Sequence, residues 1–220
     1  MQQLVFSLHQ QLHRLVSDYQ RRHDEPLFAQ QCVDLVSGHL RHLLTGDEAR
    51  RQLAKQSYAR GLRLKQGDQL IGAGPEFERH LVEFWNELFT AAGFAKPGKD
   101  YDTAAPQSIT ARITRIFVKE KPRPAAKTRL EGNVRAAALE FCSGLYDGNK
   151  LAQNLTRIAI EHLRDAISAN LTVIAEIEAL AKRHGVVMKG EGAKPPEGEA
   201  QRALLRDYLL ATIEGLQAAK

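Results

Sequence analysis

The positive charge of this chain is gathered in two short segments, and cations at such density can contact phosphate groups. The first segment, Arg50 to Lys65, holds six basic residues and no acidic residue, while the second, Arg112 to Arg135, holds eight basic and two acidic residues. Together they carry a net charge of +12, which leaves −7 on the rest of a chain whose net charge is +5. A mildly acidic body with two basic segments indicates a surface that meets a nucleic-acid backbone.

The second segment is the stronger candidate for this contact. Helical spacing places Arg112, Arg115 and Lys119 on one side, and a basic, proline-stiffened loop follows them. Phosphate binding of this kind requires positive charge at suitable spacing and reads no base sequence. An acidic protein partner and a solvated cationic surface are the alternatives. The predicted main contact comprises Arg112, Arg115, Lys119, Lys121, Arg123, Lys127 and Arg129, and the predicted second patch comprises Arg50, Arg51, Lys55, Arg60 and Arg63.

One short motif points to catalysis instead. Arg157 and His162 have an Arg-x4-His spacing that is similar to the motif of HEPN-type ribonucleases, which are also all-helical. Over these six residues, the resemblance implies that the pair polarises a scissile phosphate and moves a proton. The alternative places Arg157 in a surface ion pair with Glu161 and His162 at a packing edge. Five positions on a regular helix separate the two side chains by about 140°, which favours the alternative.

No cofactor and no metal site are predicted. The pairs His9/His13 and His39/His42 have spacings that place each pair on one helical face, but no nearby Cys, Asp or Glu completes a site. The sequence contains no P-loop and no Gly-x-Ser-x-Gly elbow. The two cysteines are predicted to be core residues of a protein in the reducing cytoplasm. No apolar run approaches the roughly 18 residues of a membrane span.

The elements that must position these residues are almost all helices. Apolar residues recur every three or four positions along most of the chain, which predicts an all-α bundle of six to eight helices. The predicted elements include a possible small basic hairpin near 61–72, a helix from Pro75 to Gly93 around the only Trp, and one long helix over about 149–184. Residues 109–119 are interpreted as a helix, although their β-branched content also allows a strand. A helix-turn-helix over 47–64, broken near Ser57, is a further alternative.

The predicted organisation is a single helical domain over 1–188, with a possible sub-boundary in the loop 94–107. A flexible linker over 189–198, rich in Gly, Pro and Glu, then tethers a C-terminal amphipathic helix over 199–220. The function predicted first is non-enzymatic: an accessory or structural subunit of a nucleoprotein complex that binds DNA or RNA through its backbone. Second comes a protein-interaction module, assembling with partners or with itself through the long and C-terminal helices. Third comes the HEPN-like ribonuclease.

Overall fold

The computed structural model describes residues 2–42, 44, 46–94, 125–190 and 195–217. Within these ranges the chain forms eight helices and three short strands, so the prediction of an all-α bundle is confirmed. The elements are α1 (Gln2–Arg22), α2 (Glu25–His42), α3 (Asp47–Ala59), β1 (Leu62–Gln66), β2 (Gln69–Ile71), α4 (Pro75–Ala91), α6 (Ala125–Cys142), α7 (Gly148–Ala169), α8 (Leu171–Arg183), β3 (Val186–Met188) and α9 (Gly198–Gln217).

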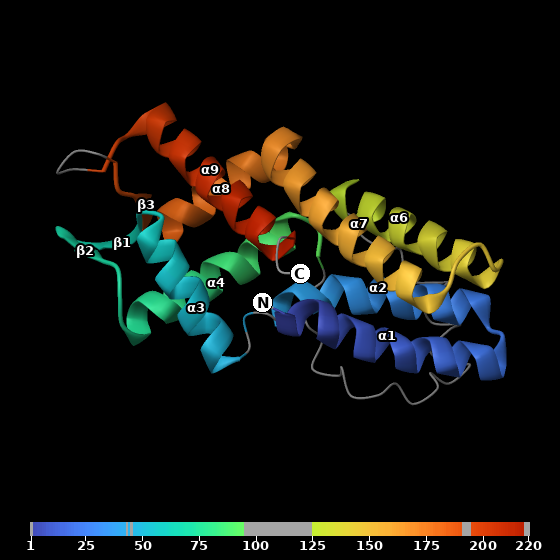
Figure 1. Cartoon of the computed structure of the whole chain (residues 1–220). Coiled ribbons are helices and arrows are strands. Elements are labelled where there is room, and N and C mark those ends of the chain that lie inside the picture. The colour runs from blue at the N-terminus through green and yellow to red at the C-terminus, as the bar shows by residue number, and fades with distance from the viewer. Residues whose placement is uncertain (1, 43, 45, 95–124, 191–194, 218–220) are drawn as a thin grey trace, which may run out of the picture.

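Four of the helices form a bundle, which we call the bundle half. Each of α1, α2, α6 and α7 packs against the next, and α7 closes the ring against α1 (Figure 1). Its apolar stripes meet in a core that includes Leu8 and Leu12 from α1, Cys32 from α2 and Leu155 from α7. The ring of Phe28 adds aromatic contacts to this core. The placement of Cys32 agrees with its prediction as a core residue.

The remaining elements form the sheet half. It contains α3, α4, α8 and α9 (Figure 1), and Nε1 of the buried Trp85 on α4 donates a hydrogen bond to the hydroxyl of Tyr208 on α9 at 3.3 Å. The same hydroxyl lies 2.6 Å from the hydroxyl of Ser57 on α3. The C-terminal helix therefore docks on the body of the chain, and its apolar residues Leu209 and Ile213 are buried there. The interaction-module prediction takes this helix, together with the long helix, as its partner surface and stays a prediction; Leu204 of the same apolar stripe is 36% exposed.

A buried arginine joins the two halves. The side chain of Arg41 on α2 is part of the core, with the whole residue 5% exposed. Its guanidinium donates to the backbone oxygen of Asn86 at 2.8 Å, to Oγ1 of Thr90 at 2.8 Å and to the backbone oxygen of Phe94 at 3.0 Å. These acceptors lie on α4 and just after it, so one side chain fixes α2 of the bundle half to α4 of the sheet half.

The hairpin predicted near 61–72 is present and forms part of a larger sheet. Strand β1 pairs antiparallel with β2 and, on its other edge, with β3, so the strand order is β2-β1-β3. Leu62 and Leu64 of β1 face the core, while Arg63 and Lys65 face outward. The third strand was not predicted. Because α3 runs unbroken to Ala59 and a strand follows it, the helix-turn-helix alternative is wrong.

The prediction of one long helix over about 149–184 is also wrong, because the helix is interrupted at Asn170. This residue has φ −89° and ψ 102°, which ends α7 and begins α8. Its side-chain Oδ1 accepts hydrogen bonds from the backbone N–H groups of Thr172 at 3.1 Å and Val173 at 3.2 Å. An Asn side chain competes in this way with the helical hydrogen bonds and caps the next helix instead.

Some predictions concern residues that lie outside the described ranges. The helix or strand over 109–119 is one of them, and so are most of the loop 94–107 and residues 191–194 of the predicted linker. Among the described helices, none has the length and apolar character needed to cross a membrane.

Candidate nucleic-acid interface

The predicted main contact is described only at its C-terminal end. Arg112, Arg115, Lys119, Lys121 and Arg123 lie outside the described residues, and Lys127 falls in the first turn of α6. Arg129, also on α6, is exposed, and its Nη2 lies 3.1 Å from Oδ2 of Asp165 on α7. The charge of Arg129 is therefore offset by a carboxylate of the neighbouring helix.

The second patch divides into two groups with different partners. On α3, Arg50 forms an ion pair with Asp47, and Arg51 lies 3.6 Å from a carboxylate oxygen of Glu48. Both pairs have the i, i+3 spacing that brings side chains together on a helix. These two arginines are partly neutralised within the first turns of α3, which reduces what they can offer to a phosphate.

In the other group, the two arginines contact neutral groups. We call it the basic sheet face, and it adds two lysines from the sheet to three residues of the predicted patch. Within the described part of the chain, none of its cations forms an ion pair with a carboxylate. Each member therefore keeps its full charge for an outside anion. The basic sheet face comprises Lys55, Arg60, Arg63, Lys65 and Lys189.

Strand geometry places three of these cations, Arg63, Lys65 and Lys189, on the outer side of the sheet. Arg63 and Lys65 alternate with the buried Leu62 and Leu64, so both point to the outer face of the sheet, about 7 Å apart along the strand. Lys189 follows β3, and its backbone N–H donates to the oxygen of Gly61 at 2.7 Å, which extends the β1–β3 ladder by one step. Since Met188 is buried, Lys189 projects from the outer side, next to β1.

Neutral contacts fix the two arginines of this face. The guanidinium of Arg63 lies 3.7 Å from the ring centroid of Tyr58 and donates to the backbone oxygens of Tyr58 and Leu62, each at 2.8 Å. Gly72 lies against the same Tyr ring: a Cβ at this glycine would come within 2.3 Å of two of its carbons. Arg60 donates to Oγ1 of Thr212 on α9 at 3.0 Å. These contacts orient the arginines without cancelling their charge.

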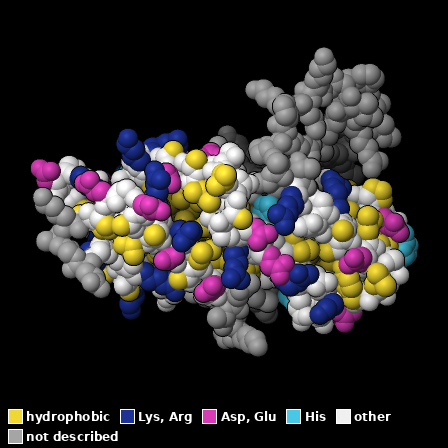
Figure 2. All heavy atoms as spheres, turned by 90° about the horizontal axis from the view of Figure 1, so that it is seen from above, with side chains coloured by type: hydrophobic (Ala, Val, Ile, Leu, Met, Phe, Trp, Pro, Cys, Tyr) yellow, Lys and Arg dark blue, Asp and Glu magenta, His cyan; other side chains and the backbone are white. Residues whose placement is uncertain are grey.

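The face of the molecule seen from above α9, α8 and α7 has a different character. Figure 2 shows Lys and Arg side chains interspersed there with Asp and Glu and with apolar groups. The ion pairs formed by these helices, among them Arg202–Glu178 at 3.1 Å, agree with that mixture. A mixed surface of this kind gives no lasting attraction for a polyanion.

The residues of the ribonuclease-like motif line one polar cavity of about 320 Å³ between α6 and α7. Arg157 Nη1 lies 2.8 Å from Oε2 of Glu161, which is the ion pair of the structural alternative. His162 is 7% exposed and donates its Nε2–H to the backbone oxygen of Ala92 at 2.8 Å. Burial lowers the pKa of His162, so its neutral form is favoured in the folded chain. The motif residues share the cavity, but each is engaged with a structural partner.

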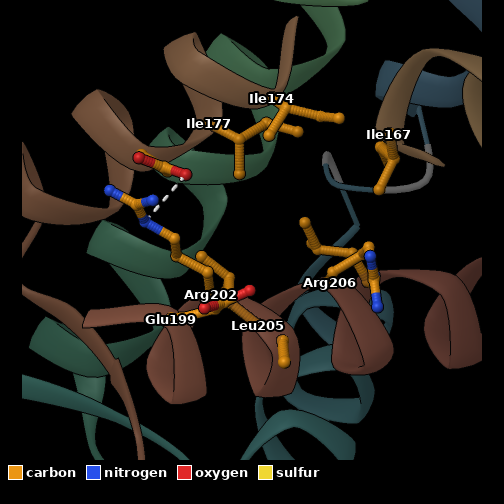
Figure 3. Close-up of a pocket in the computed structure, with 10 residues that line it drawn as sticks. Ile167, Ile174, Ile177, Glu199, Arg202, Leu205 and Arg206 are labelled. Atoms are coloured by element: carbon orange, nitrogen blue, oxygen red, sulfur yellow. Dashed lines mark ion pairs between the residues drawn. The ribbon is translucent and has the colours of Figure 1, made fainter. Parts of the chain in front are cut away.

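A second cavity, of about 290 Å³, lies where α9 crosses α8 (Figure 3). Ile167, Ile174 and Ile177 line one side of it, and Leu205 lines the other. Arg202 at its edge is paired with Glu178, which is the dashed contact in Figure 3. The lining offers apolar surface with charges of both signs, so it selects no particular class of ligand.

The histidine pairs noted in the sequence form no metal-binding cluster in the described part of the chain. His13 is exposed and His39 is buried, and neither belongs to a group of three potential ligand residues among the residues described. Two members of the basic sheet face, Lys65 and Lys189, were missing from the predicted patch. The alternation over 62–66 is a signal for Lys65, whereas Lys189 joins the face through a strand that had no recognisable pattern.

The chain matches no family model, no curated protein and no solved structure.

Proposed function

We propose that this protein binds nucleic acid through the phosphate backbone and acts as a non-enzymatic, accessory subunit of a nucleoprotein complex. The observation that carries the proposal is the basic sheet face: among the described residues none of its five cations forms an ion pair with a carboxylate, and its two arginines contact neutral groups. A polyanion that neutralises these cations releases its condensed counterions, and that release drives binding without base contacts. The proposal also includes the undescribed cations Arg112, Arg115, Lys119, Lys121 and Arg123, which extend the charge available for the same ligand.

The test is fluorescence-anisotropy binding to single- and double-stranded DNA and RNA over a series of salt concentrations. The first variant carries Lys55→Glu, Lys65→Glu and Lys189→Glu, three exposed positions of the basic sheet face. The matched control carries Arg14→Glu, Arg22→Glu and Lys150→Glu, which are exposed in the bundle half and change the net charge equally. A second variant reverses the charges of Arg112, Arg115 and Lys119.

We expect the log–log salt slope on duplex DNA to fall in the first variant by about 0.9 for each phosphate that it no longer neutralises, and to change little in the control. An equal fall in both variants would show that net charge, rather than the basic sheet face, carries the affinity. If the unmodified chain binds none of the four nucleic acids at low salt, the proposal fails and a protein partner becomes the better explanation of the charge.

One observation favours a second candidate, the cleavage of RNA. Arg129, Arg157 and His162 line the same polar cavity, so a phosphate placed there would meet two guanidinium groups and an imidazole. To act, Arg157 must leave Glu161 and the imidazole must exchange a proton with the substrate. The test is His162→Ala, which should abolish cleavage of a labelled RNA and preserve its binding. An unchanged cleavage profile in this variant would eliminate the candidate.

A further inference from the structure

Two histidines and a glutamate meet between α4 and the end of α8. His80 and Glu83 are one turn apart on α4, and His184 is the residue that caps α8. One ligand atom of each, an imidazole nitrogen or a carboxylate oxygen, lies within 4.8 Å of the other two. Nδ1 of His80 is 3.7 Å from a carboxylate oxygen of Glu83. Residues from two distant parts of the sequence thus present three donor atoms to one point.

The two imidazoles in this cluster have ring nitrogens without hydrogen-bond partners. Nδ1 of His80 and Nε2 of His184 are both buried and find no such partner within the described part of the chain. The side chain of His184 is only 8% exposed, so water has little access to it. A buried polar atom that is left unpaired is destabilising, and a bound ion at this point would satisfy both nitrogens.

We propose that His80, Glu83 and His184 bind a divalent transition-metal ion, of which Zn²⁺ is the best match. Two imidazole nitrogens and one carboxylate oxygen are the donor set that Zn²⁺ takes in many proteins. Ligands at 2.0–2.2 Å from a tetrahedral ion lie about 3.4 Å apart, so the 3.7 Å between His80 and Glu83 requires only a small side-chain adjustment.

Glu87 adjoins the cluster at His184 and could move in as the fourth ligand, although its oxygens lie outside the 4.8 Å group. Its Oε1 lies 3.5 Å from Nε2 of His184, and its other oxygen accepts a hydrogen bond from Arg183 at 2.7 Å. Arg183 thus holds the carboxylate with one oxygen turned to the cluster. A ligand that is oriented by a neighbouring charged group in this way is typical of metal sites.

The outer ring nitrogen of His80 faces a carboxylate that is near it but not hydrogen-bonded to it. If Nδ1 binds the ion, Nε2 carries the proton and needs an acceptor; Oε1 of Glu76 lies 4.0 Å away. Gln66 of β1 donates to the same oxygen at 2.6 Å. Arg79 lies 3.3 Å from Nε2, where it acts as a donor, and it must turn aside when the ion binds.

The metal site lies where α4 meets the end of α8, so a bound ion should stabilise the packing of these elements. His184 stands two residues before β3, and Gln66 ends β1, so the site lies beside the strands that display the basic sheet face. An ion that binds the folded chain alone raises its stability in proportion to the logarithm of the ion concentration. We expect it to fasten α8 and β3 to α4.

The test is isothermal titration calorimetry of the full chain with Zn²⁺ after treatment with a chelator, together with the visible absorption of Co²⁺ as a probe of coordination. We expect one ion per chain, the bands of four-coordinate Co²⁺, and a melting temperature that rises with Zn²⁺ concentration. His184→Gln and Glu83→Gln should each weaken Zn²⁺ binding at least tenfold, which is the size of effect seen when metal sites lose supporting groups. His13→Gln, at an exposed position on α1, is the matched control.

Glu83→Gln keeps the test decisive even if His184→Gln fails to fold, because Glu83 is exposed on the surface of α4. The proposal is overturned if the unmodified chain shows no saturable one-to-one binding of Zn²⁺. It is also overturned if His13→Gln weakens binding as much as Glu83→Gln does, since Zn²⁺ would then be held at scattered surface histidines.

Discussion

The polar cavity of the bundle half and the basic sheet face both contain arginines, but they use them differently. In the cavity, Arg129 is paired with Asp165 and Arg157 with Glu161. On the basic sheet face, Arg60 and Arg63 contact a hydroxyl, two backbone oxygens and an aromatic ring. In the cavity, the positive charges are therefore neutralised by carboxylates of the same chain. On the basic sheet face they are not, so they can attract an external anion.

Secondary structure accounts for much of this difference. On a helix, a carboxylate three or four residues away reaches an arginine on the same face, as Glu161 reaches Arg157. On a strand, every second side chain shares a face, which puts Arg63 and Lys65 on one side of β1, while Lys189 pairs with Gly61 and lies nearer to Arg63 than to Lys65. A count of basic residues along the sequence cannot separate these two cases, because the partner of each cation decides what it can bind.

The largest effect on stability is expected at Arg41, which joins the bundle half to the sheet half. Arg41→Met should remove the hydrogen bonds that join α2 to α4 and take the charged donor from the buried oxygen of Phe94, at a cost of about 3 kcal/mol in the free energy of unfolding. Urea unfolding followed by circular dichroism measures this change. Arg14→Met, on the exposed face of α1, is the control and should change the free energy by less than about 0.5 kcal/mol. Similar values for the two variants would mean that Arg41 does not hold the halves together.

The next effect concerns the sheet itself. Gly185 has φ +64°, and a Cβ there would lie 2.6 Å from the backbone oxygen of Lys65, whose N–H donates to Gly185. Gly185→Ala should therefore separate β3 from β1 and lower the free energy of unfolding by about 2 kcal/mol. The salt slope for nucleic acid should fall as well, because Lys189 moves away from the other cations.

The same substitution in the bundle half should act in the opposite direction. Gly132 lies inside α6 with open space around it, so Gly132→Ala should stabilise the chain by about 0.5–1 kcal/mol. Urea unfolding of both alanine variants gives the comparison. A loss of stability in Gly132→Ala, or none in Gly185→Ala, would contradict the packing described for these two sites.

Local patterns in the sequence predicted the helices, the hairpin and the central place of Trp85. Helical periodicity and turn residues are local signals, and the apolar residues that they selected on α4 and α9 are buried, except Leu204. The interruption at Asn170 escaped prediction because the apolar stripe continues on both sides of it, while the cap depends on one side-chain conformation. Strand β3 has three residues, which is too short for a periodic signal.

The candidate site was predictable only in part, because the sequence gives the cations and the fold gives their partners. The pair Arg157–Glu161 follows from helical spacing, whereas Arg129 and Asp165 are 36 positions apart and meet through the packing of α6 on α7. The cluster of His80 and His184 has the same origin, since more than a hundred residues separate its two histidines. Interactions across elements of this kind leave no spacing that a single sequence reveals.

The pH dependence of stability probes the cavity. Burial lowers the pKa of His162, so in acid the unfolded chain takes up a proton at this residue before the folded chain does. The contribution of His162 is therefore complete above the ordinary His pKa of about 6.5 and is lost as the pH falls towards the lower pKa of the folded state. Urea unfolding between about pH 7.5 and pH 5.5 should show a steeper loss in the unmodified chain than in His162→Gln, which does not titrate. Parallel curves would show that water reaches the imidazole.

The smallest expected effect on stability tests the comparison most directly. Arg157 and Glu161 are both more than half exposed, and the arginine precedes the glutamate, which is the weaker order on a helix. Glu161→Gln should therefore change the free energy of unfolding by about 0.3 kcal/mol or less.

The effect of Glu161→Gln on nucleic-acid binding should be easier to see, because Arg157 is then freed beside Arg129 in the cavity. If carboxylate partners are what keep this surface from binding phosphate, the log–log salt slope should steepen by up to about 0.9 in Glu161→Gln. An unchanged slope would show that the shape of the cavity, and not its ion pairs, separates the two surfaces.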